Sequence, residues 1–114
     1  MDTTYIGKFK RRSKNSVRLI AIHLAKEGLG DQLMDILVKV IEPTRKEQGN
    51  IAYVLHRSMD NPDELMFDEI WADNESLEAH LKQPYITSAV EQMASILDKP
   101  VELRRYSEIR PYER

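Results

Sequence analysis

The alternation of apolar and polar residues along the chain predicts four β-strands. Residues 17–25 read VRLIAIHLA, and a nearly continuous apolar run of this length is typical of a strand covered on both faces. Further runs at 51–57, 65–71 and 101–109 predict three more strands. The second and third of these four strands are separated by a loop that holds Asn61-Pro62-Asp63.

A helix is predicted between the first two strands. After the candidate N-cap Asp31, apolar residues follow the i, i+3, i+4, i+7, i+8 spacing of a helix: Leu33, Ile36, Leu37, Val40 and Ile41. Pro43 predicts that this helix kinks or restarts before Gly49 ends it.

Two more helices are predicted between the third and fourth strands. Asp73 or Asn74 caps a short helix that runs to Lys82. Pro84 begins a second, in which the apolar positions again follow the helical period: Ile86, Val90, Met93 and Leu97.

This order of elements, β-α-β-β-α-β, is the split arrangement of a ferredoxin-like α+β fold. Helices on one side of the sheet leave its other face uncovered. The strands at 17–25 and 65–71 nevertheless carry apolar side chains on both faces. Two sheets packed face to face would bury the second face, so we expect a two-fold symmetric homodimer.

Composition indicates a single globular domain and excludes several function classes. A chain of 114 residues can bury one core, and its net charge of −2 gives no attraction to nucleic acid or to an anionic membrane. There is no cysteine for a disulfide or a thiolate, and no apolar run long enough to span a membrane. We expect a soluble, cytoplasmic protein that binds neither nucleic acid nor membrane.

The chain is expected to divide into a basic extension at 1–16, a folded domain at 17–109 and a short tail at 110–114. The segment KFKRRSKNS holds five basic residues and little that would drive burial. It is either a basic arm for nucleic acid or an acidic partner, or a solvated tail. The acidic balance of the remaining chain favours the tail.

Five polar or amphipathic residues lie among apolar neighbours and are either satisfied core groups or the lining of a pocket: Glu47, Tyr53, Glu69, Trp71 and His80. Glu69 and Trp71 share one face of their strand, and Tyr53 lies on the neighbouring strand. A carboxyl group in so apolar a strand must be paired or have a raised pKa, so Glu69 marks either a pocket or a bond made for packing. His80 lies on or beside the apolar face of its helix, as a core group or as a catalyst.

Three polar residues are less informative. His23 interrupts the first strand and lines either the same cavity or the dimer face. Glu47 and Asn50 flank Gly49, and we interpret them as turn and capping groups. The sequence contains no phosphate-binding loop, no dinucleotide fingerprint and no hydrolase motif, and its histidines are not spaced as metal ligands.

The residues between Pro43 and Leu81 resemble the antibiotic biosynthesis monooxygenase family. Its members read Pro-Thr, Glu-x-Gly before the second strand, Tyr within it, Glu-x-Trp in the third strand and Ala-His-Leu in the following helix. This chain has, in the same order, Pro43-Thr44, Glu47-Gln48-Gly49, Tyr53, Glu69-Ile70-Trp71 and Ala79-His80-Leu81. The likeness covers about residues 17–106 and leaves out the N-terminal extension.

The resemblance implies a dimeric α+β barrel and an enzyme that oxidises quinols or polyphenols with O₂, without metal, flavin or nicotinamide. His80 would then be the general base or proton relay, and Glu69 would orient or polarise it. Trp71 and Tyr53 would form an aromatic wall or donate a hydrogen bond to the substrate, and His23 is the remaining candidate for substrate binding.

The same resemblance leaves other functions open. Heme-degrading relatives pair an asparagine of the first strand with a tryptophan and a histidine, and VRLIAIHLA contains no asparagine. Relatives that isomerise a phosphorylated signalling ketone have a similar Glu-x-Gly-Asn turn, present here as Glu47 to Asn50. A third reading is a dimer that binds small aromatic molecules without catalysis.

Overall fold

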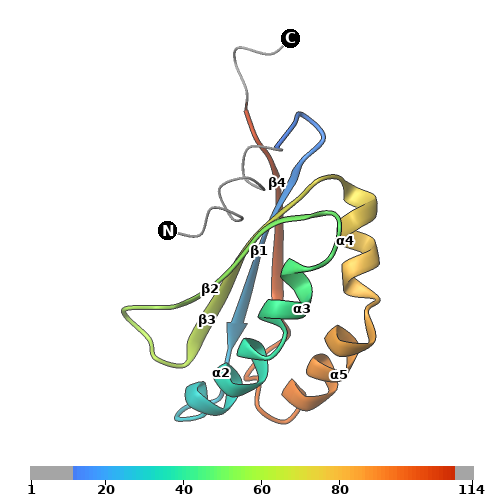
Figure 1. Ribbon diagram of the computed structural model, residues 1–114. Coiled ribbons are helices and arrows are strands. Elements are labelled where there is room, and N and C mark those ends of the chain that lie inside the picture. Colours follow the sequence, from blue (N-terminus) through green and yellow to red (C-terminus); the bar gives the residue numbers. More distant parts are fainter. Residues whose placement is uncertain (1–11, 110–114) are drawn as a thin grey trace.

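The computed structural model describes residues 12–109, which form one four-stranded antiparallel sheet with helices on one side (Figure 1). The strand order is β2-β3-β1-β4. The strands are β1 (Val17–Leu24), β2 (Asn50–Arg57), β3 (Glu64–Trp71) and β4 (Glu102–Ser107). This is the predicted ferredoxin-like α+β fold, and all four predicted strands are present within one or two residues at each end.

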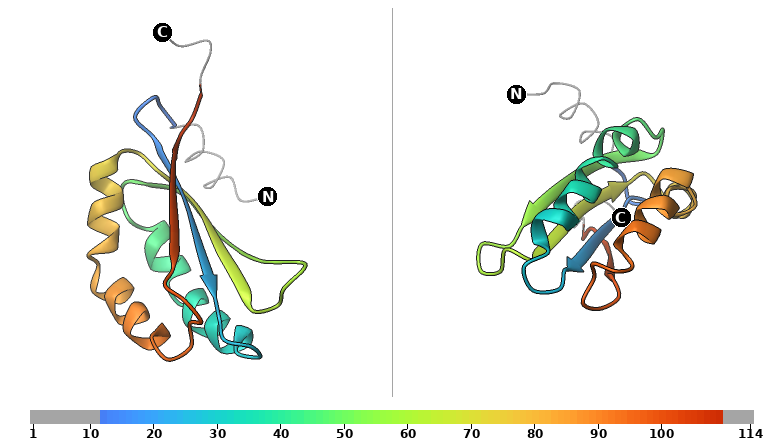
Figure 2. Two further views of the ribbon diagram at one scale, coloured as in Figure 1. Left: turned by 180° about the vertical axis from the view of Figure 1, so that it is seen from behind. Right: turned by 90° about the horizontal axis from the view of Figure 1, so that it is seen from below.

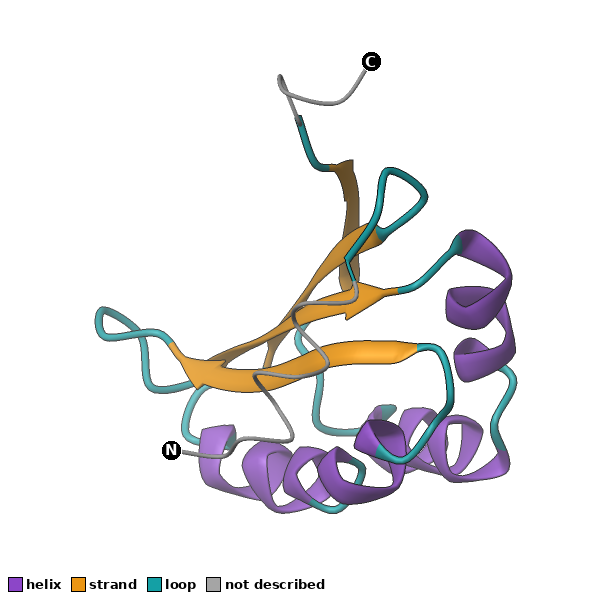
Figure 3. Ribbon diagram, turned by 45° about the horizontal axis from the view of Figure 1, so that its top comes forward, coloured by secondary structure: helices purple, strands orange, loops and turns teal. Residues whose placement is uncertain are grey.

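The helices are α2 (Gly30–Val38), α3 (Ile41–Arg45), α4 (Asn74–Leu81) and α5 (Pro84–Met93). Figure 3 shows them gathered on one side of the sheet, and Figure 2 gives the view from behind and from below. None of these helices is long and apolar enough to cross a membrane.

The predicted first helix is in fact two helices, and the break lies before Pro43 rather than at it. Helix α2 ends at Val38, and α3 begins at Ile41. Pro43 is therefore in the first turn of α3, where a backbone N–H has no partner within the helix and its loss is tolerated.

The other two predicted helices begin where the structure has them, but the second of them ends earlier than predicted. The Asp73 side chain accepts a hydrogen bond from the backbone N–H of Ser76 at 2.8 Å and so caps α4. Helix α5 begins at Pro84 but ends at Met93, four residues before Leu97. Leu97 instead forms an isolated antiparallel bridge with Ala25, which joins the end of β1 to the chain after α5.

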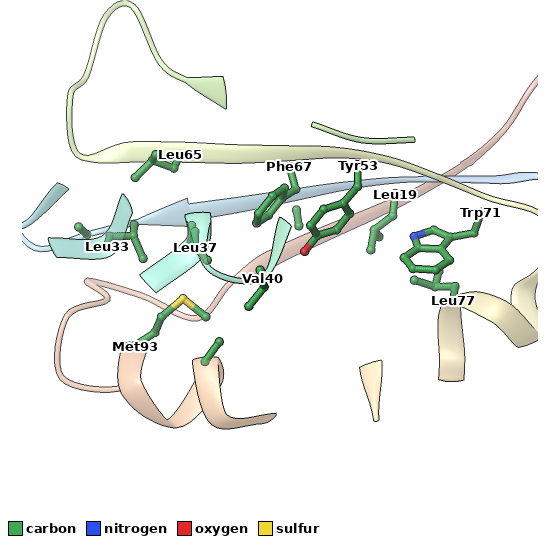
Figure 4. Packing of buried hydrophobic residues seen from close by; sticks show 13 residues of the cluster. Leu19, Leu33, Leu37, Val40, Tyr53, Leu65, Phe67, Trp71, Leu77 and Met93 are labelled. Carbon is green, nitrogen blue, oxygen red and sulfur yellow. The ribbon is translucent and has the colours of Figure 1, made fainter. Parts of the chain in front are cut away.

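Strand register arranges the inward-facing side chains in rows across the sheet, and three rows follow one another beyond the pair of Val17 and Trp71. In the first row Tyr53 pairs with Glu69, and Glu69 with Leu19; in the second Phe67 pairs with Ala21, and Ala21 with Leu103. His23 pairs with Leu65 in the third row. The helices pack over these rows, and Figure 4 shows Leu37, Val40 and Met93 facing the aromatic rings of the sheet.

The outer face of the sheet carries no helix among the described residues. Ile20, Ile22 and Met66 are only half-buried there, next to a small buried cluster of Ile51, Ala52 and Ile70. Apolar side chains on a face with no helix over it are typical of a surface that another subunit covers.

Of the two predicted domain boundaries, the one at 16 lies within the described residues and the one at 110 lies at their limit. Residues 1–11 and the tail at 110–114 lie outside them, so these parts of the prediction stay untested. The described end of the N-terminal extension contacts the domain, because Arg12 forms an ion pair with Glu108 at 2.8 Å and Ser16 is buried.

We predict a homodimer formed through the outer face of the sheet. Ile22→Arg would place a long charged side chain in the middle of this face and should yield a folded monomer, because burying a charge at an interface removes its hydration. Val38→Arg is the control, since Val38 is 44% exposed on α2, away from this face. Analytical ultracentrifugation of the wild type at micromolar concentration would contradict the prediction if it gave only a monomer.

Candidate functional site

A cavity of about 140 Å³ lies between the inner face of the sheet and the helices. Its lining is apolar except for four side chains, His23, Tyr53, Glu69 and His80. A dry cavity of ~150 Å³ in another protein admits benzene, so this space suits one flat aromatic ring, with more room toward its mouth.

The cavity opens to solvent between α5 and the edge strand β4. Val90 on α5 and Leu103 on β4 both line it, and they are 55% and 48% exposed. Two small residues, Ala21 on the sheet and Ala89 on α5, also line it and leave the space between the layers unfilled. A ligand would therefore enter over apolar side chains and meet the polar groups inside.

Glu47 holds His80 in place from the turn between α3 and β2. Its Oε2 atom lies 2.7 Å from Nδ1 of His80, near the end of α4, and accepts a hydrogen bond from the hydroxyl of Tyr85, in the first turn of α5. The Glu47 side chain is only 13% exposed. A buried carboxyl group needs such donors, and here they come from two different helices.

Gly49 lets this turn approach α4. A Cβ atom at residue 49 would overlap the side chain of Ser76, in the first turn of α4, so the close approach requires glycine. The backbone N–H of Ala72 also donates to the carbonyl of Gly49 at 2.8 Å, which joins the turn to the end of β3. The spacing Glu-x-Gly thus places a carboxyl group opposite the histidine of α4.

The bond to Glu47 fixes how His80 can act. A carboxylate can only accept, so Nδ1 carries the proton and Nε2 is left as the basic nitrogen. Burial lowers the pKa of His80 below its ordinary value, and Glu47 opposes this shift in part. The imidazole is therefore neutral near pH 7 and able to accept a proton at Nε2.

Glu69 stands in a different environment in the same cavity. Its Oε1 atom accepts a hydrogen bond from the indole N–H of Trp71 at 2.9 Å, and it is 3% exposed. Burial, only partly offset by this bond, raises the pKa of Glu69 to about 8, and Glu47 adds to the increase. Glu69 is thus largely a neutral carboxylic acid near pH 7, which makes its second oxygen a hydrogen-bond donor.

Aromatic rings form a continuous row along the cavity. Tyr53 stacks on Phe67 with ring centroids 4.2 Å apart and meets His80 edge-on at 5.5 Å. Trp71 lies 4.6 Å from the His80 ring on the other side. Figure 4 shows the Tyr53 hydroxyl pointing from the sheet toward the helices. Burial and the nearby Glu69 raise the pKa of Tyr53, so its hydroxyl remains protonated.

The structure brings four of the predicted site residues together: Tyr53, Glu69, Trp71 and His80. It does not pair Glu69 with His80, as the resemblance implied; Glu69 bonds Trp71, and Glu47 holds the histidine. The interpretation of Glu47 as a turn group is incomplete: its backbone carbonyl accepts the N–H of Asn50 in the turn at 3.0 Å, and its side chain in addition holds His80. The Glu-x-Gly spacing was the available signal, but the partners of Glu47 lie 33 and 38 residues away.

The two remaining polar residues of the sequence analysis, Asn50 and His23, lie on β2 and β1. Asn50 donates from its side-chain amide to the carbonyl of Ala52 at 3.0 Å, which agrees with a turn role. His23 lines the cavity, not the outer face of the sheet, and meets Phe67 edge-on at 6.0 Å. Among residues 12–109 no group of three or more acidic or histidine side chains is placed to hold a metal ion.

Comparison with known structures shows that the fold is shared. The crystal structure of a Shewanella oneidensis protein is 27% identical and matches with a TM-score of 0.79, over 84% of this chain and 93% of that chain. The structure of a Mycobacterium tuberculosis protein is 26% identical and matches with a TM-score of 0.78, over 86% of this chain and 99% of that chain. The crystal structure of an antibiotic biosynthesis monooxygenase matches with 21% identity and a TM-score of 0.77, over 82% of this chain and 99% of that chain.

Sequence comparison adds one curated relative and a family. An uncharacterized protein of Synechocystis sp. is 33% identical over 66 residues, which are 58% of this chain and 45% of the relative, so the match spans less than half of that protein. The model of the antibiotic biosynthesis monooxygenase family matches residues 16–92. With two thirds of its length matched, and with the same fold as a monooxygenase of that name, this chain belongs to the antibiotic biosynthesis monooxygenase family.

Proposed function

We propose that this protein is a monooxygenase that oxidises a quinol or a similar polyphenol with O₂ and needs no metal, flavin or nicotinamide. The observation that carries the proposal is a buried base, His80 held by Glu47, at the wall of an apolar cavity of aromatic size. Membership of the antibiotic biosynthesis monooxygenase family agrees with this chemistry.

The substrate ring would lie in the cavity with its hydroxyl group toward His80. Nε2 removes the phenolic proton, and Glu47 stabilises the imidazolium that forms. The electron-rich phenolate then passes one electron to O₂, which is held in the same apolar space. The protein contributes binding, removal of water and proton transfer, whereas the substrate supplies the electrons.

The atoms and electrons balance without a further reductant. The semiquinone radical and superoxide combine by forming a carbon–oxygen bond, which gives a peroxide on the ring. The O–O bond then breaks; one oxygen stays on the ring and the other leaves as water. A quinol with one free ring position thus becomes a hydroxyquinone, giving up four electrons to one O₂ molecule.

Glu69 would supply the proton for the departing oxygen. It is the neutral acid of the site, and the Trp71 indole holds its Oε1 atom, which leaves the second oxygen to face the ligand. An acid and a base with pKa values shifted in opposite directions are typical of sites that move protons in both directions. Trp71 therefore positions Glu69 as well as contributing to the aromatic wall.

The lining of the cavity does not favour isomerisation of a phosphorylated ketone. A phosphate group in a protein usually meets arginine or lysine, or the N-terminus of a helix. The described residues that line this cavity include neither arginine nor lysine. A neutral aromatic ligand suits these walls better than a doubly charged one.

We predict oxygen uptake with dihydroquinones and no added cofactor, and a slower rate in His80→Ala. Loss of an acid–base group should lower kcat by roughly one hundredfold or more. Glu75→Ala is the control, because Glu75 is exposed on the same helix as His80 and should leave the rate unchanged. An oxygen electrode measures the rates of both variants and of the wild type with a panel of one- and two-ring quinols.

Two results would contradict the proposed function. Oxygen uptake that never exceeds the buffer rate for any quinol, together with aromatic ligands that bind, would indicate a binding protein. Turnover of a phosphorylated hydroxyketone without oxygen consumption would indicate the isomerase.

We also predict that Glu69→Gln stabilises the protein more at pH 8 than at pH 5. Folding raises the pKa of Glu69 from 4.5 to about 8. Stability from this group is therefore fully present below pH 4.5 and is lost, by about 1.4 kcal/mol per unit, as the pH rises to 8. Glutamine accepts the Trp71 bond and cannot ionise, so its advantage should grow by about 2–4 kcal/mol across this range.

Urea unfolding at the two pH values measures the difference, with Glu91→Gln, an exposed glutamate of α5, as the control. An equal effect of Glu69→Gln at both pH values would show that Glu69 is ionised in the folded protein and is not the acid of the site.

A further inference from the structure

His23 lies at the far end of the cavity from the proposed acid and base. It occupies the third row of the sheet, opposite Leu65, whereas Glu69 and Tyr53 occupy the first row. The row between them holds Phe67 and the small Ala21. A ligand over Ala21 would therefore have polar groups at both ends and apolar side chains along its length.

The His23 imidazole is buried and incompletely hydrogen-bonded. The residue is 5% exposed, and its Nδ1 atom has no hydrogen-bond partner among the described residues. Burial lowers the pKa of His23, and hydrogen bonding of the ring with the backbone of Leu65 and of Ala21 opposes this shift only in part, so the imidazole is neutral. A buried polar atom without a partner is unfavourable, and phenylalanine would fill this place without that penalty.

The separation of the two polar ends can be estimated from the strand geometry. His23 is four residues from Leu19, which pairs with Glu69. Four residues at ~3.3 Å each span ~13 Å, and two hydrogen bonds of ~2.8 Å leave roughly 7 Å between the ligand atoms that accept or donate them. A ligand that uses both ends must carry a second oxygen on the side of the ring system remote from the reacting hydroxyl.

We propose that His23 is a specificity-determining residue, which hydrogen-bonds a second oxygen of the substrate at the end of the cavity opposite Glu69 and His80. This inference rests on the proposed binding of an aromatic substrate in the cavity. A neutral imidazole offers one N–H donor and one acceptor, so it recognises a hydroxyl or a carbonyl group equally well. It would select aromatics with oxygen at both ends over those with oxygen at one end.

The test compares two ligands that differ only in the remote oxygen, 2,6-dihydroxynaphthalene and 2-naphthol. Isothermal titration calorimetry under nitrogen measures binding without turnover. The wild type should bind the diol about five- to tenfold more tightly than 2-naphthol, which is the scale of one neutral hydrogen bond. His23→Phe should remove this preference by weakening only the diol, and His23→Gln, which keeps a donor and an acceptor, should retain part of it.

Thermal unfolding of the free protein gives a second readout. Because His23→Phe removes a buried polar atom without a partner, its melting temperature should equal or exceed that of the wild type. A lower melting temperature or failure to fold would show that His23 serves the core and would overturn the proposal. Equal affinities of the wild type for the two ligands, equal weakening of both in His23→Phe, or no binding of either would also overturn it.

Failure of this inference can be told apart from failure of the proposed function. A preference for the diol that His23→Phe abolishes, without oxygen uptake, would keep the role of His23 and reject the monooxygenase. Oxygen uptake by a wild type that does not distinguish the two ligands would reject the role of His23 and keep the monooxygenase.

Discussion

The hydrogen bonding of the Glu47 carboxyl group is the constraint on which the arrangement of the site depends. This largely buried carboxyl group receives hydrogen bonds from His80 on α4 and from Tyr85 on α5. One side chain in a turn thereby fixes the relative positions of two helices and of the loop before β2. Gly49 makes the contact possible, because any larger residue would collide with Ser76.

The two glutamates of the site, Glu47 and Glu69, have different roles because their hydrogen-bond partners differ. Glu47 receives hydrogen bonds from an imidazole and a phenol, whereas the one side-chain donor recorded for Glu69 is the indole of Trp71. Glu47 therefore supports His80 as a base, and burial keeps Glu69 protonated near pH 7. The cavity that Glu69 and His80 line is largely apolar, which strengthens both effects because apolar walls screen charge weakly.

The sequence predicts most of the fold, because the spacing of apolar residues that indicates a strand or a helix involves only residues close together in the chain. It also places Tyr53, Glu69, Trp71 and His80 near one another through strand pairing and the helix that follows β3. It does not reveal the partner of His80, since Glu47 reaches that residue through a turn whose closure depends on packing against α4. The sequence predicts the break between α2 and α3 but places it at Pro43, whereas α3 begins two residues earlier at Ile41, because proline is tolerated in a first helical turn and does not have to mark the boundary.

The protonation state of His80 tests the central claim most directly. Nitrogen-15 NMR of labelled imidazoles across the pH range reports which ring nitrogen carries the proton and at what pH each histidine titrates. The account predicts that His80 titrates below its ordinary value of 6.5, is protonated at Nδ1 when neutral, and titrates lower still in Glu47→Gln, which removes the stabilising carboxylate. A His80 that titrates at or above 6.5, or that carries its proton at Nε2 when neutral, would contradict the account.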